Sequence, residues 1–332
     1  MKATLETIAY RFRRPLVTSY GTLERRELLL LRLEMGGTRG VGEAAPLPAY
    51  DGVSLDEVRQ ALAPALADLQ AYTEGSAARV AQPQAAAALE VALQDHAARS
   101  TNVPIASLLA DAPTATIPVN ATIAATDPAE AAREAADATA ASFSCVKLKV
   151  GLAGDIDRVT AVRDAVGPDV AIRVDANGAW TVEEALAALE GLGAAGLELC
   201  EEPVRGVQAH ADLRERLNGA VRIAMDESAA DPAAWGSGAT DAMCLKVAAC
   251  GGISRLLDAA NEARAAGSDV YVASTYDGPV GIAAGLHAAA ALGVTLPCGL
   301  VTLPLFEDLD DPFPAGDGAI ALPRAPGLGL PD

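Results

Sequence analysis

The chain has little of the residues that bind transition metals through nitrogen or sulfur. Only three of its 332 residues are histidine, and its five cysteines include no Cys-x-x-Cys spacing. A zinc site therefore has little support. The cysteines are scattered, at positions 145, 200, 244, 250 and 298, and three of them fall inside expected strands. We expect them to be reduced, buried side chains of a cytoplasmic protein.

Basic residues are also few. Lys and Arg number 25 against 44 Asp and Glu, which gives a net charge of −19. This charge disfavours nucleic acid and anionic membranes as partners. No basic segment followed by an apolar stretch stands at the N-terminus, so we expect no secretion signal. No apolar run reaches transmembrane length, because Asp, Glu, Arg or Gly interrupts each alanine-rich stretch.

The length and the apolar content predict two domains. With 51% hydrophobic residues among 332, the chain can bury a large core. Residues 1–112 predict an α+β domain, because strand signals come first and helix signals follow. Its expected strands lie at 3–12, 27–34 and 40–44, its expected helices at 54–72 and 84–99, and two candidate lid loops at 18–21 and 49–52.

From residue 113 to residue 303 the pattern alternates between short strands and helices. Eight strands are expected, at 117–123, 143–150, 169–175, 197–201, 221–226, 241–246, 269–274 and 298–302. This pattern predicts an α/β fold, a modified (β/α)₈ TIM barrel. A doubly wound open sheet is the competitor, but it would not place charges at so many consecutive strand ends. Residues 304–332 lack a clear period, and we expect them to pack back on the N-terminal domain.

Charged residues end five consecutive strands of the expected barrel. They are Lys149, Asp175, Glu201, Asp226 and Lys246, at steps of 26, 26, 25 and 20 residues. A buried strand has no cheap place for a charge, so the series predicts one shared polar site. In a barrel, such side chains converge at the carboxyl ends of the strands, with Lys246 across the mouth from Lys149.

The chemistry of this set points to a metal-assisted proton transfer. The carboxylates of Asp175, Glu201 and Asp226 repel one another unless a cation lies between them. Oxygen ligands favour a hard ion, Mg²⁺ first and Mn²⁺ second. Lys147 and Lys149 are two residues apart and therefore point to the same side of their strand. A metal and a neighbouring ammonium should lower the pKa of a lysine and make it a base near neutral pH.

Each residue also has an ordinary structural explanation. An Asp at a strand end often caps the next helix, and Lys147 alone could be a solvent-facing charge. Glu202 could replace Glu201 as a ligand, since only one of two adjacent side chains faces the site. Arg173 shares a face with Asp175 and could form an ion pair or contact substrate. The coincidence of the whole set at the strand repeat favours the functional interpretation.

Short motifs surround these charged residues. They are Lys-x-Lys at 147–149, Val-Asp-Ala-Asn-Gly at 174–178, Glu-Glu-Pro at 201–203, Asp-Glu-Ser at 226–228, and Gly-Gly at 251–252 after Lys246. Together they resemble the enolase superfamily, muconate lactonizing enzyme subgroup, and Gly42-Glu-Ala-Ala-Pro46 matches its N-terminal capping domain. The resemblance covers almost the whole chain, and it implies a capping domain completed by the C-terminal segment.

The resemblance also implies a role for each charged residue. Asp175, Glu201 and Asp226 would be the metal ligands. Lys149 would be the base that removes a proton alpha to a carboxylate, giving a metal-stabilised enediolate. Lys147 would be its electrostatic partner, and Lys246 would act from the opposite face. The substrate would be a small carboxylate, and the oligomeric state stays open, a homo-oligomer included.

Within the subgroup, four further segments look most like the short o-succinylbenzoate synthases. They are Pro118–Thr122, Arg173–Trp180, Gly281–His287 and Pro297–Leu300. Such enzymes dehydrate a cyclohexadiene carboxylate on the way to menaquinone. The alternatives are a dipeptide epimerase, an N-succinylamino acid racemase or a muconate cycloisomerase. An alternative of another class is a catalytically silent barrel that only binds, but it would have no reason to keep all five charged residues.

Local departures rank these alternatives. The racemases tend to have Lys-Pro-x-Arg-x-Gly-Gly after the sixth strand, whereas this chain has Lys246-Val-Ala-Ala-Cys-Gly-Gly252 without the Arg. The Asp-x-Asp pair of the dipeptide epimerases is missing from 301–305, and Tyr276-Asp277 differs from the pattern expected in synthases. The residues expected to contact substrate or to support the site are Arg173, Asn177, Ser19, Tyr20, Ser274, Thr275 and Tyr276.

Overall fold

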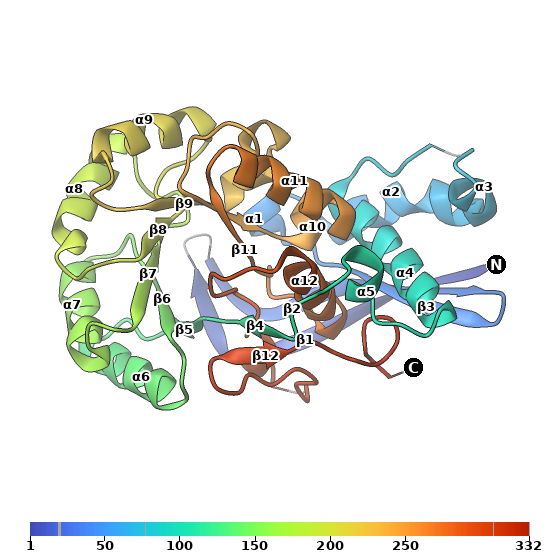
Figure 1. The fold of residues 1–332 in the computed structure, drawn as a ribbon, viewed down its shortest axis with the longest axis horizontal. Helices are drawn as coiled ribbons and strands as arrows, with labels where there is room; N and C mark the ends of the chain where they lie inside the picture. Colours follow the sequence, from blue (N-terminus) through green and yellow to red (C-terminus); the bar gives the residue numbers. More distant parts are fainter. Residues whose placement is uncertain (19–20, 77, 308, 332) are drawn as a thin grey trace.

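A computed structural model describes residues 1–18, 21–76, 78–307 and 309–331 (Figure 1). Its first part is an antiparallel sheet in the order β1-β2-β3. The strands are β1 (Lys2–Thr18), β2 (Gly21–Met35) and β3 (Thr38–Ala44). β1 and β2 run beyond the predicted bounds, with a register shift between Arg11 and Leu16. Pro15 lies inside that shift, where a residue without an N–H is tolerated.

Helices follow this sheet in the chain, and α4 packs on β2 and β3. They are α1 (Pro48–Asp51), α2 (Leu55–Ala67), α3 (Leu69–Thr73), α4 (Pro83–Ser100) and α5 (Ala106–Leu109). Ser54 and Glu57 form the predicted capping box at the start of α2. The helix predicted through residue 72 is broken at Asp68, which caps α3 instead. The loop expected at 49–52 is largely the short helix α1.

Helix α4 lies directly on β3, and this close approach is possible because two positions of β3 are glycine. A Cβ atom on Gly42 would lie 1.9 Å from the carbonyl oxygen of Ala88, and one on Gly40 would lie 2.1 Å from that of Ala92. Both contacts are with helix backbone, which cannot move without shifting the whole of α4. The glycines therefore set the distance between helix and sheet.

Gly42→Ala is expected to lower the free energy of unfolding by about 1–3 kcal/mol, the usual cost of overpacking a core. Urea denaturation followed by circular dichroism measures it. Gly316→Ala is the matched control, because a Cβ there meets nothing within 4 Å and the backbone is unstrained. Equal stability of the two variants would contradict the packing argument.

The second part is a curled parallel sheet in the order β11-β10-β9-β8-β7-β6-β5. The strands are β5 (Ala121–Ile123), β6 (Cys145–Lys149), β7 (Ala171–Asp175), β8 (Leu199–Glu201), β9 (Ile223–Met225), β10 (Ala242–Leu245) and β11 (Asp269–Val272). The predicted eighth strand is present only as two parallel bridges, Val119 with Cys298 and Ala273 with Gly299. Val119 precedes the edge strand β5, and Ala273 follows the edge strand β11, so the segment at 298–299 connects the two edges of the sheet. The barrel is therefore modified, as expected.

Helices follow most of the strands and surround the sheet (Figure 1). They are α6 (Pro128–Ala140), α7 (Asp155–Val166), α8 (Val182–Gly193), α9 (Val207–Leu217), α10 (Val247–Cys250), α11 (Ile253–Ala265) and α12 (Pro279–Leu292). The alternation of strand and helix predicts an α-helix after β9, and this prediction was wrong. Two short 3₁₀ helices, η1 (Glu227–Ala230) and η2 (Pro232–Ala234), lie there, because Pro232 and the nearby glycines stop an α-helix.

The C-terminal residues run back toward the first sheet. After η3 (Leu303–Leu305), β12 (Ala319–Ala321) pairs with β4 (Thr116–Pro118). Phe306 bridges to Phe12, and the amide of Leu328 donates to Asp95 of α4 at 2.7 Å. The domain limits at residues 112 and 303 stay a prediction.

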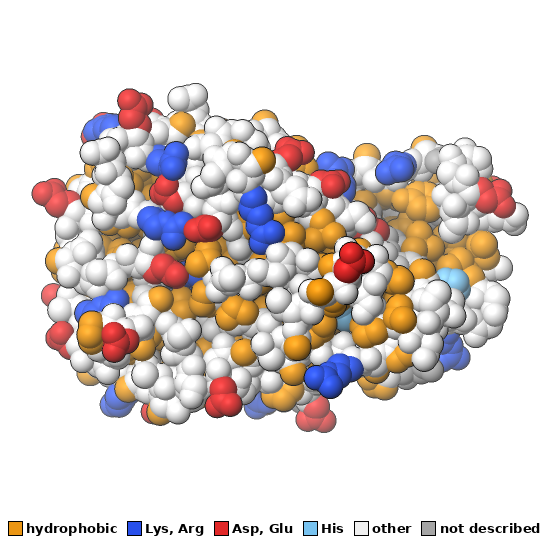
Figure 2. All heavy atoms as spheres, viewed as in Figure 1, with side chains coloured by type: hydrophobic (Ala, Val, Ile, Leu, Met, Phe, Trp, Pro, Cys, Tyr) orange, Lys and Arg blue, Asp and Glu red, His pale blue; other side chains and the backbone are white. Residues whose placement is uncertain are grey.

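On the face in Figure 2, acidic and basic side chains lie among one another rather than in separate areas. In the part of the chain that the structure describes, no helix is long and apolar enough to span a membrane.

Candidate active site at the barrel mouth

The five predicted charged residues lie together at the carboxyl ends of the strands. Lys149 pairs in register with Asp175, and Asp175 with Glu201, so three of them are direct neighbours on β6, β7 and β8. Asp226 follows β9 and Lys246 follows β10. All five line one cavity of about 100 Å³. The strand repeat therefore converts a regular spacing in sequence into a cluster in space.

On one side of the cavity, two lysines neutralise two of the carboxylates. Lys147 Nζ lies 2.5 Å from Glu201 Oε1 and 2.8 Å from Asp175 Oδ2. Lys149 Nζ donates to the same Asp175 oxygen at 2.6 Å. Burial alone would raise the pKa of Asp175, but the two ammonium groups outweigh it and hold that pKa well below its usual value.

The same contacts act on Lys149. Burial lowers its pKa, but Asp175 outweighs burial and raises the pKa of Lys149 above the usual value, while the charge of Lys147 lowers it. The lowered lysine pKa predicted from the sequence assumes a metal cation beside the lysine. In the chain alone the carboxylates bind the lysines, so their effect on the pKa of Lys149 has the opposite sign.

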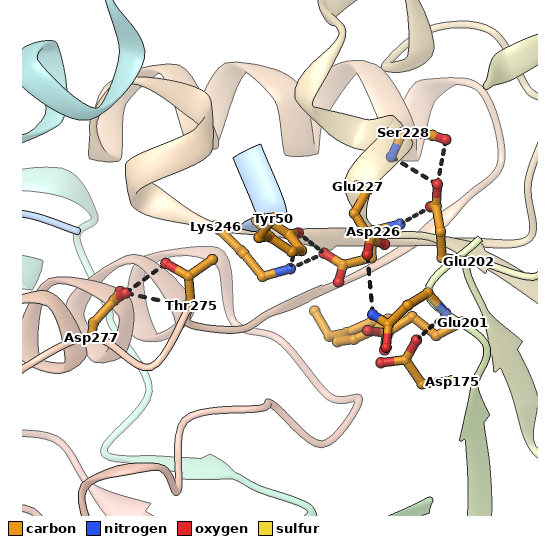
Figure 3. A network of polar contacts seen from close by, with 12 residues as sticks. Tyr50, Asp175, Glu201, Glu202, Asp226, Glu227, Ser228, Lys246, Thr275 and Asp277 are labelled. Carbon is orange, nitrogen blue, oxygen red and sulfur yellow. Dashed lines mark hydrogen bonds and ion pairs between the residues drawn. The ribbon is translucent and has the colours of Figure 1, made fainter. Parts of the chain in front are cut away.

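Lys246 approaches from the other side. Its ammonium contacts Asp226 Oδ1 and donates to the Tyr50 hydroxyl at 2.9 Å (Figure 3). The Tyr50 hydroxyl in turn donates to Asp226 at 3.2 Å. Burial lowers the pKa of Lys246 to about 8. This lysine is therefore closer to a neutral base at physiological pH than Lys149 is.

Tyr50 is a site residue that we did not predict. It lies on α1, inside the segment expected to be a lid, and it is brought to the barrel mouth by the first domain. The only signal in the sequence was an aromatic residue in the proline-rich connection 46–50. That signal does not say which end of the barrel the tyrosine will meet.

Glu201 and Glu202 take opposite directions. Glu201 faces the cavity, whereas Glu202 accepts hydrogen bonds from the amides of Asp226 at 2.7 Å and Ser228 at 3.1 Å (Figure 3). The backbone of Glu202 has φ +39°, an uncommon conformation for a residue with a side chain. Glu202 thus holds the segment that carries Asp226, rather than pointing into the cavity.

The predicted supporting residues divide into two groups. Asn177, also at positive φ, accepts from Lys149 Nζ at 2.7 Å and donates to Glu227 at 3.0 Å, so it orients the lysine. Ser274, Thr275 and Tyr276 line the cavity. The two remaining predicted contacts, Ser19 and Tyr20, lie outside the described residues.

Arg173 does not reach the cavity. It is fully buried, and its guanidinium pairs with Glu198 and donates to the carbonyl of Pro297 at 2.6 Å. Of its two proposed roles, the structure therefore shows the ion pair. The guanidinium also lies 4.6 Å from the centre of the Tyr271 ring, and the Tyr271 hydroxyl donates to Glu201 Oε2 at 2.7 Å. Tyr271 was not predicted either.

Comparison with known families agrees with this architecture. Residues 130–331 match the family model described as enolase C-terminal domain-like. Residues 2–110 match the model of the mandelate racemase / muconate lactonizing enzyme N-terminal domain. The chain belongs to the enolase superfamily. The resemblance inferred from the motifs is thereby confirmed.

Solved structures of the superfamily confirm the fold class. The N-succinyl Arg/Lys racemase of Bacillus cereus has a TM-score of 0.88 at 28% identity, and the match covers 99% of this chain and 95% of that one. The muconate lactonizing enzyme of Pseudomonas putida has a TM-score of 0.86 at 27% identity, over 99% of this chain and 96% of that one.

Among curated relatives, the o-succinylbenzoate synthase of Mycobacterium tuberculosis (strain H37Rv) is 46% identical over 218 residues. That match covers 63% of this chain and 64% of the relative. The chain thus spans less than two thirds of the length of this curated relative.

The donor atoms at the barrel mouth fit a hard divalent cation. Among the described residues, ligand atoms of Glu201, Asp226 and Cys244 lie within 4.8 Å of one another. Burial and the nearby Glu201 raise the pKa of the Cys244 thiol well above its usual value, so it is a poor ligand. Asp175 is in register with Glu201 and lines the same cavity, but it is not part of this close group. Carboxylate oxygens suit Mg²⁺ better than a neutral thiol does, so the acidic residues at this edge fit a hard ion better than Cys244 does.

Tyr271→Phe is expected to weaken divalent metal binding about tenfold, the low end of the effect of residues that orient a ligand. The variant keeps the ring against Arg173 and removes only the hydrogen bond to Glu201. Isothermal titration with MgCl₂ measures the change. Tyr72→Phe, in α3 and far from the barrel in sequence, is the control. Unchanged affinity in Tyr271→Phe would show that Glu201 does not need this donor.

Proposed function

We propose that the chain is a divalent-metal-dependent lyase of the o-succinylbenzoate synthase type. The observation that carries the reaction class is the position of three carboxylates between two opposed lysines in one cavity. The substrate class rests on the 46% identity to a relative with that name. The substrate is a small carboxylate, the protein acts in the cytoplasm, and its oligomeric state stays open.

Asp175, Glu201 and Asp226 would hold the cation, Mg²⁺ first and Mn²⁺ second. When bound, the cation supplies several kcal/mol of stabilisation for the negative charge that develops beside the substrate carboxylate. Its charge would also replace the lysines as the partner of the carboxylates. Lys149 would then lose the contact that raises its pKa, which leaves it able to accept a proton.

Lys149 removes the proton alpha to the substrate carboxylate, and Asn177 orients its Nζ toward that proton. Lys147 keeps a second ammonium beside it, which favours the neutral form of Lys149. The hydroxyl group of the substrate then leaves, and the proton held by Lys149 completes a water molecule. One base suffices for this dehydration. Lys246 stabilises charge from the opposite face, held in place by Tyr50.

A racemisation or epimerisation is the second candidate. Two lysines face one cavity from opposite sides, as a two-base exchange of an α-proton requires, and the pKa of Lys246 is lowered to about 8. The missing Arg after Lys246 disfavours an N-succinylamino acid racemase, and a dipeptide epimerase or a muconate cycloisomerase remains as a further alternative.

The test is incubation with the cyclohexadiene carboxylate substrate of o-succinylbenzoate synthases, and separately with N-succinyl amino acids, dipeptides and muconate. We expect turnover of the first substrate with loss of water, no activity after treatment with EDTA, and recovery with Mg²⁺. Turnover of one of the other substrates alone would assign the corresponding alternative. If no compound reacts or exchanges its α-proton, the proposal fails in favour of a binding protein.

A further inference from the structure

A cluster of three buried ionisable residues lies between the first domain and the barrel, outside the charged set described above. Arg26 on β2, Glu43 on β3 and Asp277 after β11 are 2%, 7% and 5% exposed. None of them lines the substrate cavity. Burying charges costs several kcal/mol per ion unless each finds partners, so such a cluster requires an explanation. All three residues contact the loop at 274–278 or belong to it.

Arg26 ties this loop to the first domain. Its Nε donates to the carbonyl of Thr275 at 3.1 Å, and its two terminal nitrogens donate to the carbonyls of Ala45 at 2.6 Å and Pro46 at 2.5 Å. The Thr275 amide and hydroxyl lie 3.1 and 2.9 Å from Asp277 Oδ1 (Figure 3). One guanidinium therefore joins the barrel loop to the segment after β3.

Glu43 holds the other end of the loop. Its Oε1 accepts from the Gly278 amide at 2.7 Å. A Cβ atom on Gly278 would lie 2.6 Å from Glu43 Oε2, and one on Gly281 would lie 2.7 Å from Oε1, so both glycines leave room for this carboxyl group. Burial, and then the nearby Asp277, raises the pKa of Glu43 to about 8, and Arg26 lowers it.

Tyr276 stands between these two anchors. It lines the substrate cavity and has φ +58°, a left-handed conformation that costs a non-glycine residue of order 1 kcal/mol. Its ring packs edge-on against Phe12 of β1, with ring centres 5.8 Å apart. A strained backbone conformation persists only where neighbouring contacts fix it. Here the contacts come from Phe12, Arg26 and Glu43 of the first domain.

We propose that Arg26, Glu43 and Asp277 are positioning residues that fasten the 274–278 loop to the capping domain and fix Tyr276 in the substrate-binding wall. Substrate preference then depends on residues that never touch the substrate. The catalytic lysines and carboxylates stand on other strands, so loosening the loop changes substrate binding more than the chemical step. This inference rests on the proposed function for its kinetic readout only.

Two variants and two controls test it. Arg26→Met and Glu43→Ala should each raise KM about tenfold with kcat changed less than about threefold, because they remove binding rather than chemistry. Glu43→Gln keeps an acceptor for the Gly278 amide and should restore KM to within about twofold of the wild-type value. Arg25→Met, the neighbouring exposed arginine on the other face of β2, should change neither constant.

Hydrogen–deuterium exchange provides a readout that needs no substrate. Amides 275–278 should exchange at least about tenfold faster in Arg26→Met and Glu43→Ala than in the wild-type protein, because their closed state has lost its anchors. Exchange in α8 should stay unchanged, which separates loosening of the loop from unfolding. If Arg26→Met does not fold, Glu43→Ala carries the test by itself.

The outcomes are distinct. Unchanged exchange at 275–278 in the folded variants overturns the proposal. Faster exchange with an unchanged KM, or a fall in kcat at constant KM, also overturns it, because the loop would then not position substrate. A wild-type protein that turns over none of the tested substrates refutes the proposed function, while the exchange data still decide whether the cluster anchors the loop.

Discussion

Lys149→Ala is expected to abolish exchange of the substrate's α-proton with D₂O and to lower kcat by about 10³-fold or more, the contribution of a positioned general base. Lys149 is the residue whose Nζ is oriented by both Asp175 and Asn177, at 2.6 and 2.7 Å. Among the described residues that line the cavity, Lys147 is the other amine on the same strand, and it is bound to two carboxylates. Proton NMR of the substrate in D₂O measures the exchange directly.

Two further variants show whether the loss comes from the missing base or from the missing charge. Lys149→Arg keeps a positive charge beside Asp175, but a guanidinium does not lose its proton in proteins, so this variant should be as inactive as the alanine variant. Lys2→Ala, an exposed lysine at the start of β1, should behave as wild type. Retained exchange in Lys149→Ala would assign the base to another residue, with Lys246 the first to test.

The charged strand ends were predictable because they depend on local sequence alone. Parallel strands of a barrel recur at nearly constant spacing and end at the same edge, so Asp175, Glu201 and Asp226 are expected near one another once the barrel is inferred. The direction of Glu202 was not predictable, because it depends on a backbone conformation at φ +39° that no local signal marks. Its partners, Asp226 and Ser228, are on the next strand-end segment.

Residues that reach the site through tertiary contacts escaped prediction for the same reason. Tyr50 meets Lys246 across a separation of 196 residues, and Tyr271 meets Glu201 across 70. Tyr50 lies outside the strand repeat. Tyr271 lies 25 residues after Lys246, on the next strand, but it is uncharged and so does not stand out in the series. The docking of the first domain on the barrel decides the contact of Tyr50, and sequence spacing does not encode that docking. Most of the segment 49–52 forms the short helix α1, and its role as a lid stays a prediction.

The same limit applied to the fold. The alternation of strand and helix predicted the barrel, but the last strand was expected at 298–302 and forms only two bridges. The segment after β9 was expected to be helical, yet Pro232, Gly236 and Gly238 interrupt it within a few residues. Strong periodicity was thus a good guide to which elements exist, and a poor guide to how irregular segments close the structure.

Asp226→Asn is expected to remove metal-dependent activity, with a fall in kcat/KM of about 10³-fold or more at fixed Mg²⁺. The substitution keeps the size of the side chain and removes the negative charge that the proposed cation shares with Asp175 and Glu201. Titration with MgCl₂ should show a matching loss of affinity. Asp231→Asn is the matched control, since this exposed Asp only caps a 3₁₀ helix and Asn caps equally well.

Cys244→Ala decides between the two ligand sets that the geometry allows. If the cation is held by the three carboxylates, removing the thiol should leave the affinity for Mg²⁺ within about threefold of wild type, because a neutral thiol contributes little to a hard ion. If Glu201, Asp226 and Cys244 were the ligands, the alanine variant would lose affinity as Asp226→Asn does, and Asp175→Asn would not. Full Mg²⁺-dependent activity in Asp226→Asn would exclude both sets.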